Sequence, residues 1–287
     1  MSDRAEQIAA AAEAIKACSA LVVTCGAGMG VDSGLATFRG RYQESAGWGP
    51  IERGEETPYS MCKPRRFDQD AALAWGYAVE RYKAFEAAAP HAGYDIILGW
   101  RKPMAVFTSN IDSHWYRATL ASGGLVPVVE YHGSMRHVQC HRNCRGCITP
   151  VNHDLVVATA VDAQSGRAAA LYPPCDDCGA MQRFNVCLIA DDHFNTAMRD
   201  EQLKAFERFL TKWERTDLVV LEIGAGKAIP TVRDMSERIY QQRECPTLVR
   251  INVDDPEVPQ ALLGDGGAIS LQGGALEMLR AIAAKMQ

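Results

Sequence analysis

The chain has 287 residues, enough for one large domain with an insertion or for two domains. Its formal net charge of −5 argues against a nucleic-acid partner, because non-specific binding to nucleic acid needs a basic surface. It has no run of about 18 apolar residues and no signal-peptide pattern, so we expect no membrane partner and a cytoplasmic location. In that reducing compartment its ten cysteines are better explained as metal ligands or buried thiols than as disulfides.

The predicted elements alternate between helices and short buried strands. A helix capped by Ser2 or Asp3 is expected to run to about Cys18. Apolar runs rich in β-branched residues are expected as strands at residues 21–23, 104–108, 126–131, 218–223 and 247–253. Helical patterns, notably at 200–215 and 275–286, separate several of these runs. Uninterrupted apolar strands are typical of parallel sheets, so we predict a doubly wound, Rossmann-like α/β fold.

Two segments interrupt this alternation. Residues 41–90 are expected to form a long crossover with a polar start and a helical end at 71–85. Residues 136–184 are rich in cysteine and are expected to form an inserted small module. The remaining parts, residues 1–40, 91–135 and 185–287, would then make up the nucleotide-binding domain.

A glycine-bearing segment, residues 24–40, follows the first predicted strand. Glycines after a buried strand let backbone N–H groups approach a diphosphate, and the next helix adds its positive end. The dinucleotide fingerprint G-x-G-x-x-G fails here, because Val31 stands three residues beyond Gly28. The segment also carries Phe38 next to Arg39, a pair that the phosphate turn of a dehydrogenase does not need.

A second glycine cluster, residues 224–227, follows the predicted strand at 218–223. It is not a P-loop, because Ala228 follows Lys227 and no glycine stands five positions before Gly226. The two clusters therefore exclude a kinase and an ordinary dehydrogenase.

The cysteine-rich module contains two groups of closely spaced thiols. Cys175 and Cys178 form a C-x2-C pair, and Gly179 after it lets the backbone turn toward the sulfurs. Three more cysteines lie about thirty residues upstream: Cys140, Cys144 and Cys147. Two cysteine pairs at this separation indicate a structural zinc ion with four thiolate ligands.

The choice of ligands in the upstream group depends on position. We predict Cys140 and Cys144 as ligands together with Cys175 and Cys178, because Cys140 directly follows an apolar strand end. Cys147 is the reserve ligand and His141 a less favoured one. A set of thiols without metal is the alternative.

Two further motifs lie between these features. Residues 108–112 read Thr-Ser-Asn-Ile-Asp at a strand end, and His132-Gly133 follows the next strand. Together with the glycine segment, the cysteine module, the second glycine cluster and a late Ile251-Asn252, they resemble the ordered landmarks of the sirtuins, the NAD-dependent protein deacylases. The resemblance spans about residues 20–275. Each landmark alone is weak, but the ordered set is specific.

The resemblance implies that the chain consumes NAD and acts on an acylated protein or peptide. Phe38 would shield the ribose carbon, and Arg39 would order the loop over the pyrophosphate. The implied catalytic residues are His132, which would take a proton from a ribose hydroxyl, and Asn110 and Asp112, which would hold the carboxamide and ribose. The implied cofactor-binding residues are Gly26, Ala27, Gly28, Thr37, Phe38, Arg39, Ser109, Asn110, Asp112, His132, Gly224, Ala225, Gly226 and Asn252.

The chain also departs from the sirtuin pattern. Thr37 stands where most members carry aspartate, Ser109 replaces a glutamine, and Gly30 replaces a serine. Residues 186–194 replace the V-x-F-G-E type of acyl-lysine channel, and residues 222–230 replace the usual G-T-S strand end. These departures resemble a divergent bacterial branch that includes the macrodomain-linked sirtuins.

Three functions follow from this comparison. The first is an NAD-dependent protein deacylase, which the retained His132 favours over the macrodomain-linked type, since that type resembles protein ADP-ribosyltransferases and lacks this histidine. The second is an NAD-dependent ADP-ribosyltransferase or NAD glycohydrolase on the same scaffold. The third is a nucleotide-binding module without catalysis.

Overall fold

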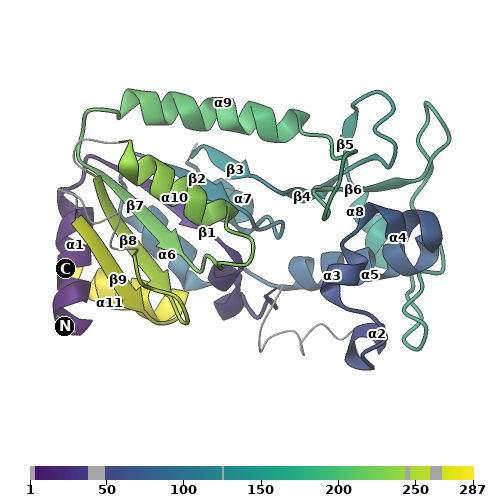
Figure 1. Cartoon of the computed structure of the whole chain (residues 1–287), viewed down its shortest axis with the longest axis horizontal. Coiled ribbons are helices and arrows are strands. Elements are labelled where there is room, and N and C mark those ends of the chain that lie inside the picture. Colours follow the sequence, from purple (N-terminus) through teal and green to yellow (C-terminus); the bar gives the residue numbers. More distant parts are fainter. Residues whose placement is uncertain (1–3, 38–48, 125, 243–245, 259–266) are drawn as a thin grey trace.

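The structure is a computed structural model that describes residues 4–37, 49–124, 126–242, 246–258 and 267–287. It has two parts (Figure 1). The larger part is a six-stranded sheet with helices on both faces, and the smaller part combines a three-stranded sheet with several short helices.

The large sheet is parallel throughout, in the order β3-β2-β1-β7-β8-β9. Its strands are β1 (Ala20–Cys25), β2 (Met104–Thr108), β3 (Val128–Glu130), β7 (Leu218–Ile223), β8 (Pro246–Asn252) and β9 (Gly267–Gln272). Every residue of β1, β2 and β7 is buried, as expected for strands covered on both faces. The parallel order and the flanking helices confirm the predicted doubly wound α/β class.

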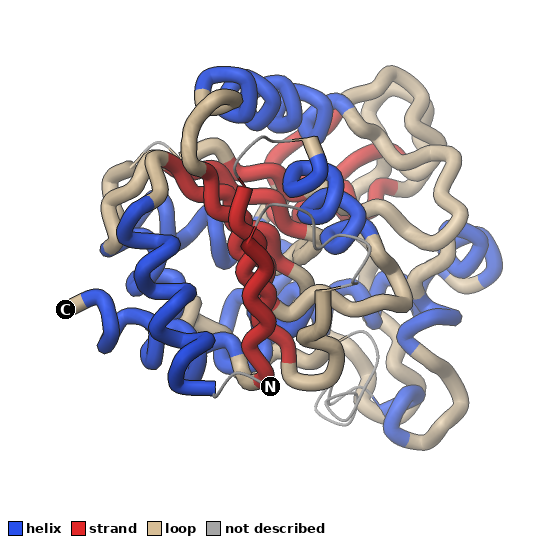
Figure 2. Tube along the Cα trace, turned by 60° about the vertical axis from the view of Figure 1, so that its left-hand side comes forward, coloured by secondary structure: helices blue, strands red, loops and turns tan. Residues whose placement is uncertain are grey.

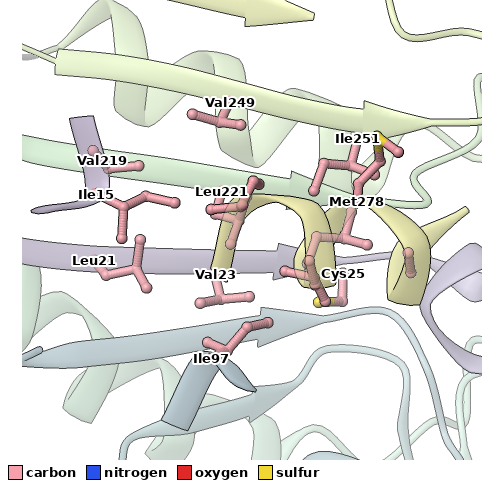
Figure 3. Packing of buried hydrophobic residues seen from close by; sticks show 14 of the residues in the cluster. Ile15, Leu21, Val23, Cys25, Ile97, Val219, Leu221, Val249, Ile251 and Met278 are labelled. Atoms are coloured by element: carbon pink, nitrogen blue, oxygen red, sulfur yellow. The ribbon is translucent and has the colours of Figure 1, made fainter. Parts of the chain in front are cut away.

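Helices cover both faces of the large sheet (Figure 2), and Figure 3 shows the core that contains Leu21 and Val23. Alternate residues of β1 supply the two hydrophobic cores on either side of the sheet. Leu21 and Val23 pack under α1 (Arg4–Ala17), α6 (Ala92–Gly99), α7 (His114–Ala121) and α11 (Ala275–Met286). Val22 packs on the other face, under α9 (Ala197–Lys212) and α10 (Thr231–Gln241). Because side chains alternate across a strand, one apolar run serves both cores.

The smaller part is built on an antiparallel sheet in the order β5-β4-β6. Its strands are β4 (Gly133–Cys140), β5 (Ile148–Pro150) and β6 (Gln182–Val186). Its helices are α2 (Gly49–Glu52), α3 (Pro58–Met61), α4 (Pro64–Gln69), α5 (Ala71–Ala87) and α8 (His153–Ala158). Trp75 and Tyr82 of α5 stack on Phe184 of β6, with ring centroids 5.0 and 5.4 Å apart. The helical insertion and the cysteine-rich segment therefore share one core.

Several predicted elements differ in extent from the structure. The helix expected to reach Cys18 ends at Ala17, and the helix expected at 200–215 is α9, Ala197–Lys212. The strand β9 was not predicted, because it lies at the sheet edge and only Leu271 of its residues is buried. Among the helices of the described segments, none has both the length and the apolar character needed to cross a membrane.

Candidate active site

Two glycine-bearing turns meet where the order of the sheet reverses, between β1 and β7. The first turn, after β1, leads into the 3-10 helix η1 (Ala27–Ser33). Within it, the Gly28 N–H donates to the Gly224 carbonyl of the second turn at 3.0 Å. A Cβ added to Gly28 would lie 2.6 Å from the Gly224 Cα, and one added to Gly26 would lie 2.6 Å from the Gly224 oxygen. Gly224 itself has φ +62°. Only glycine permits this backbone-to-backbone contact at the carboxyl edge, which is where doubly wound folds bind ligands.

The turn after β2 is tied to the turn after β1. Thr108 donates from Oγ1 to the Cys25 carbonyl at 3.1 Å, and the same oxygen accepts from the Asn110 N–H at 3.0 Å. Asn110 in turn donates from Nδ2 to the Gly26 carbonyl at 3.0 Å. The Thr108–Asn110 turn therefore holds the glycine turn of β1 in place.

Asp112 is a buried carboxylate at the same edge, with 8% of its surface exposed. Its Oδ1 accepts from the His114 N–H at 2.9 Å. A Cβ on Gly30 would lie 3.5 Å from its Oδ2, so this oxygen faces η1. Burial raises the pKa of Asp112 to about 6, although the bond from the His114 amide acts in the opposite direction.

His132 follows β3 and contacts both the segment after β6 and the start of α10. Its carbonyl accepts from the Cys187 N–H at 2.9 Å, and its Nε2 is 3.5 Å from the Thr231 Oγ1. Burial lowers the pKa of His132 below its usual 6.5, and a hydrogen bond to the Ser109 backbone partly offsets this effect. His132 is therefore neutral at pH 7, the state that a general base requires.

Asn252, at the end of β8, binds two loops. It donates from Nδ2 to the Ala225 carbonyl at 2.8 Å, and its Oδ1 accepts from the backbone of Asp254 and Asp255 at 3.1 and 3.2 Å. Its side chain thus holds the loop after β7 against the loop after β8.

The structure brings most of the expected cofactor residues to one edge of the sheet. Those that lie on the turns after β1, β2, β3, β7 and β8 are Gly26, Ala27, Gly28, Ser109, Asn110, Asp112, His132, Gly224, Ala225, Gly226 and Asn252. Thr37 is half-buried beyond η1. Phe38 and Arg39 lie outside the described residues. A cavity of about 800 Å³ between α9 and α10 and another of about 1040 Å³ beside α8 contain none of these residues, so concavity alone does not locate the site.

The four predicted metal ligands converge in the smaller part. The sulfurs of Cys140, Cys144, Cys175 and Cys178 all lie within 4.8 Å of one another. The Cys140–Cys178 and Cys144–Cys175 sulfurs are each 3.6 Å apart. Tetrahedral zinc with Zn–S bonds of about 2.3 Å places its sulfurs about 3.8 Å apart. The donor set and its spacing therefore fit a structural zinc ion with no open coordination position.

The two other candidate ligands are not in this cluster. The exposed Cys147 approaches the Arg145 carbonyl, 3.9 Å from its sulfur. His141 instead pairs through Nε2 with Asp68 at 3.0 Å.

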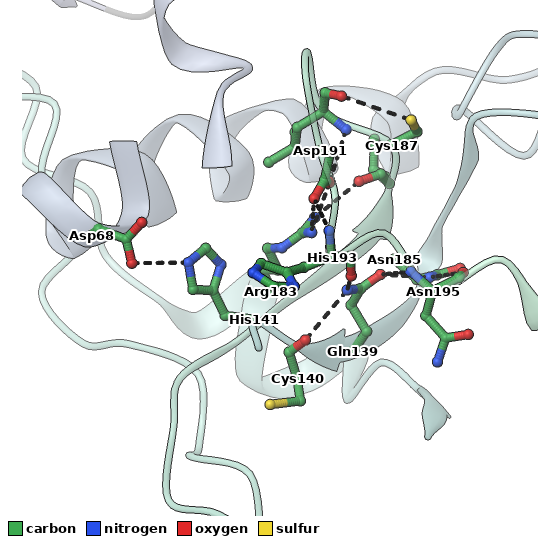
Figure 4. Close-up of polar contacts among 12 residues, drawn as sticks. Asp68, Gln139, Cys140, His141, Arg183, Asn185, Cys187, Asp191, His193 and Asn195 are labelled. Atoms are coloured by element: carbon green, nitrogen blue, oxygen red, sulfur yellow. Dashed lines mark hydrogen bonds and ion pairs between the residues drawn. The ribbon is translucent and has the colours of Figure 1, made fainter. Parts of the chain in front are cut away.

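The segment after β6, which departs from the sirtuin channel pattern, folds around one buried carboxylate (Figure 4). Asp191 accepts two bonds from Arg183, at 2.7 and 2.8 Å, and both side chains are almost completely buried. Asp191 also accepts from the backbone of Leu188 and His193 at 3.1 and 3.2 Å. The segment also contacts His132, because the Cys187 N–H at its start donates to the His132 carbonyl. The Arg183–Asp191 pair was not predicted from the sequence, because it joins β6 to the loop that follows.

Two residues of α10 near the site were not predicted from the sequence. Thr231 approaches His132, and Arg233 bonds to both Ala225 and Asp255. The only sequence signal is their position just after the second glycine cluster.

The profile of the Sir2 family matches residues 26–230, which include both glycine turns, His132 and all four clustered cysteines. The chain belongs to the Sir2 family. It is 30% identical over 224 residues to the NAD-dependent protein deacylase 2 of Pseudomonas aeruginosa, covering 76% of this chain and 77% of that protein. It is 27% identical over 165 residues to the NAD-dependent protein deacylase of Mycolicibacterium paratuberculosis, covering 57% of this chain and only 60% of that protein.

The Sir2 fold extends over nearly the whole chain. A solved Sir2 homologue variant in complex with ADP-ribose has a TM-score of 0.67 at 23% identity, covering 96% of this chain and 95% of that one. At this identity the likeness shows the fold.

Proposed function

We propose that this Sir2 family member is an NAD-dependent protein deacylase, which cleaves nicotinamide from NAD and transfers a lysine acyl group to ADP-ribose. The observation that carries the proposal is the half-buried His132, whose pKa is lowered by burial, on the same sheet edge as Asn110, Asp112 and the paired glycine turns. The names of the two curated relatives and the ADP-ribose bound to the structural neighbour support it.

The dinucleotide would cross the point between β1 and β7 where the strand order reverses. The base His132 and the Asn110–Asp112 turn belong to the β2–β3 side, so the nicotinamide ribose would lie there. The adenosine half would then lie over the turns after β7 and β8. NAD supplies an electrophilic ribose carbon once nicotinamide leaves.

Separate side chains at this edge would bind the cofactor and accept the proton. Asn110 and Asp112 would hold the nicotinamide ribose and carboxamide, with Oδ2 of Asp112 facing η1. His132 would accept a proton at one ring nitrogen from a ribose hydroxyl, which makes that oxygen nucleophilic toward the acyl-derived carbon. Phe38 would shield the ribose carbon and Arg39 would act at the pyrophosphate, as the resemblance implies.

The four-cysteine cluster would serve the fold and not the reaction. Cys140, Cys144, Cys175 and Cys178 would hold one zinc ion, which joins the end of β4 to the segment before β6. A cluster of thiols needs a reducing compartment to stay available for metal, so we propose a cytoplasmic location.

Incubation with NAD and an acetyl-lysine or longer acyl-lysine peptide tests the proposal. We expect equal amounts of free nicotinamide and deacylated peptide, and neither product from Asn110→Ala. His132→Ala should retain NAD binding but lose acyl transfer. Nicotinamide release without an acylated peptide would indicate a glycohydrolase, and ADP-ribose attached to protein would indicate a transferase. No release of nicotinamide with any acyl-lysine peptide would refute the proposal.

A further inference from the structure

Arg233 in α10 connects the two loops on the β7–β8 side of the site. Its Nε donates to the Ala225 carbonyl at 3.0 Å, and its second terminal nitrogen donates to the Asp255 carbonyl at 2.6 Å. Ala225 belongs to the turn after β7, and Asp255 to the loop after β8. Only 6% of Arg233 is exposed. One planar guanidinium thus sets the distance between the two loops.

The Ala225 carbonyl is held from two directions, since Asn252 also donates to it at 2.8 Å. A trans peptide group points its N–H opposite to its C=O, so fixing this carbonyl also fixes the direction of the Gly226 N–H. Gly226 is exposed, and a Cβ added there would meet no atom within 4 Å. The residue that carries this fixed amide is therefore open to solvent at the carboxyl edge of the sheet.

Arg233 is held by carbonyl groups and not by a carboxylate. Among the residues that the structure describes, it forms no ion pair, whereas the neighbouring Arg250 pairs with Glu222 at 2.7 Å and with Glu237 at 2.8 Å. Arg250 also donates to the Glu257 carbonyl at 2.8 Å, so it anchors the loop after β8 at a second point. The guanidinium of Arg233 therefore acts on the two loops as a hydrogen-bond donor, and its charge already interacts with Glu222, Asp255 and Glu237.

We propose that Arg233 is a positioning residue for the adenosine half of NAD, acting through the Ala225–Gly226 peptide and the Asp255 loop. The inference rests on the proposed function, because that function places the adenosine half over these two loops. Arg233 would not touch the reacting atoms. Its loss should weaken cofactor binding and leave the chemical step unchanged.

Calorimetric titration with ADP-ribose tests this role without any need for catalysis. Arg233→Met keeps the length of the side chain but removes all donors, and Arg233→Lys keeps the charge but cannot span two carbonyls. We expect about tenfold or greater loss of affinity for Arg233→Met and a smaller loss for Arg233→Lys. Arg238→Met is the matched control on the same helix, since its side chain is 47% exposed and its polar partners among the described residues are Glu207 and Met235, with no bond to either loop.

Steady-state kinetics and thermal unfolding separate positioning from a general structural role. For Arg233→Met we expect a higher KM for NAD, with kcat and the KM for acyl peptide unchanged. The melting temperature without ligand should stay close to that of the wild type, while the rise in melting temperature on adding ADP-ribose shrinks. If Arg233→Met does not fold, Arg233→Lys carries the same test.

The outcomes distinguish the two proposals. A wild-type protein that does not bind ADP-ribose or NAD would overturn the proposed function and this inference with it. A wild type that binds, with Arg233 variants that bind equally well, would overturn the inference alone. Loss of kcat and of unliganded stability at constant KM for NAD would also overturn it, because Arg233 would then act on the fold as a whole.

Discussion

Asp112→Asn should stabilise the protein in a pH-dependent way while it impairs the reaction. Asp112 is 8% exposed, and burial raises its pKa from the usual 3.8 to about 6. At about 1.4 kcal/mol per pKa unit, ionisation of Asp112 destabilises the folded protein by about 3 kcal/mol relative to the unfolded chain. Asparagine keeps the acceptor for the His114 N–H at this position and carries no charge.

The sign follows from proton linkage. Because the pKa of Asp112 is raised in the folded state, its contribution to stability is fully present below pH 3.8 and is lost as the pH rises through about 6. Asparagine has no such loss. The free energy of unfolding of Asp112→Asn, relative to the wild type, should therefore increase by roughly 2 kcal/mol between about pH 4.5 and pH 7.5.

Urea unfolding of both proteins, followed by tryptophan fluorescence across this pH range, measures the difference. The exposed Asp192 offers a control, since Asp192→Asn also removes one carboxylate but none that is buried. Nicotinamide release by Asp112→Asn should fall despite the gain in stability. A stability difference that does not change with pH, or that shrinks as the pH rises, would refute the reasoning from burial.

Three other predictions concern separate parts of the molecule. Cys175→Ser should lose zinc and unfold more readily, since structural zinc contributes about 10–16 kcal/mol in small peptides, whereas Cys147→Ser should keep one zinc per chain in metal analysis. Gly224→Ala should lower the free energy of unfolding by about 1–3 kcal/mol or more, because φ is +62° and the new Cβ would lie 2.4 Å from the Gly28 Cα. Gly226→Ala is the control and should leave the free energy of unfolding unchanged, because its Cβ would meet no atom within 4 Å. Because burial lowers the pKa of His132, the acyl-transfer rate should persist below pH 6.5 and fall only on further acidification; a midpoint above pH 6.5 in the pH–rate profile would contradict this.

Local patterns were sufficient for the central elements of the fold. The apolar runs at 104–108 and 218–223 and the helical pattern at 275–286 correspond to β2, β7 and α11 with the same bounds. Every residue of the two strands is buried, and α11 buries one face, which consists of Ala275, Met278, Leu279 and Ile282. The pattern is therefore strong over the length of each segment. The edge strand β9 and the polar strands of the smaller sheet carry no such signal.

The sequence by itself determined which residue types follow each strand. Parallel strands bring their carboxyl ends to one edge, so the glycine turns, Asn110, Asp112 and His132 were expected together. Likewise, the spacing of the cysteines was enough to indicate two pairs of thiols. Only the tertiary structure decided that Cys147 lies outside the cluster, because neighbouring thiols with similar spacing are separated by the path of the turn between β4 and β5.

Contacts between distant segments were decided by the tertiary structure alone. Thr231 with His132, and Arg233 with Asp255, join elements whose relative positions depend on the packing of the whole sheet. Each is a polar pair without a periodic pattern, so nothing in the local sequence marks its partner. Hydrophobic periodicity records which side of a strand or helix is buried, but the direction and partner of a buried polar group are set only once the cores have packed.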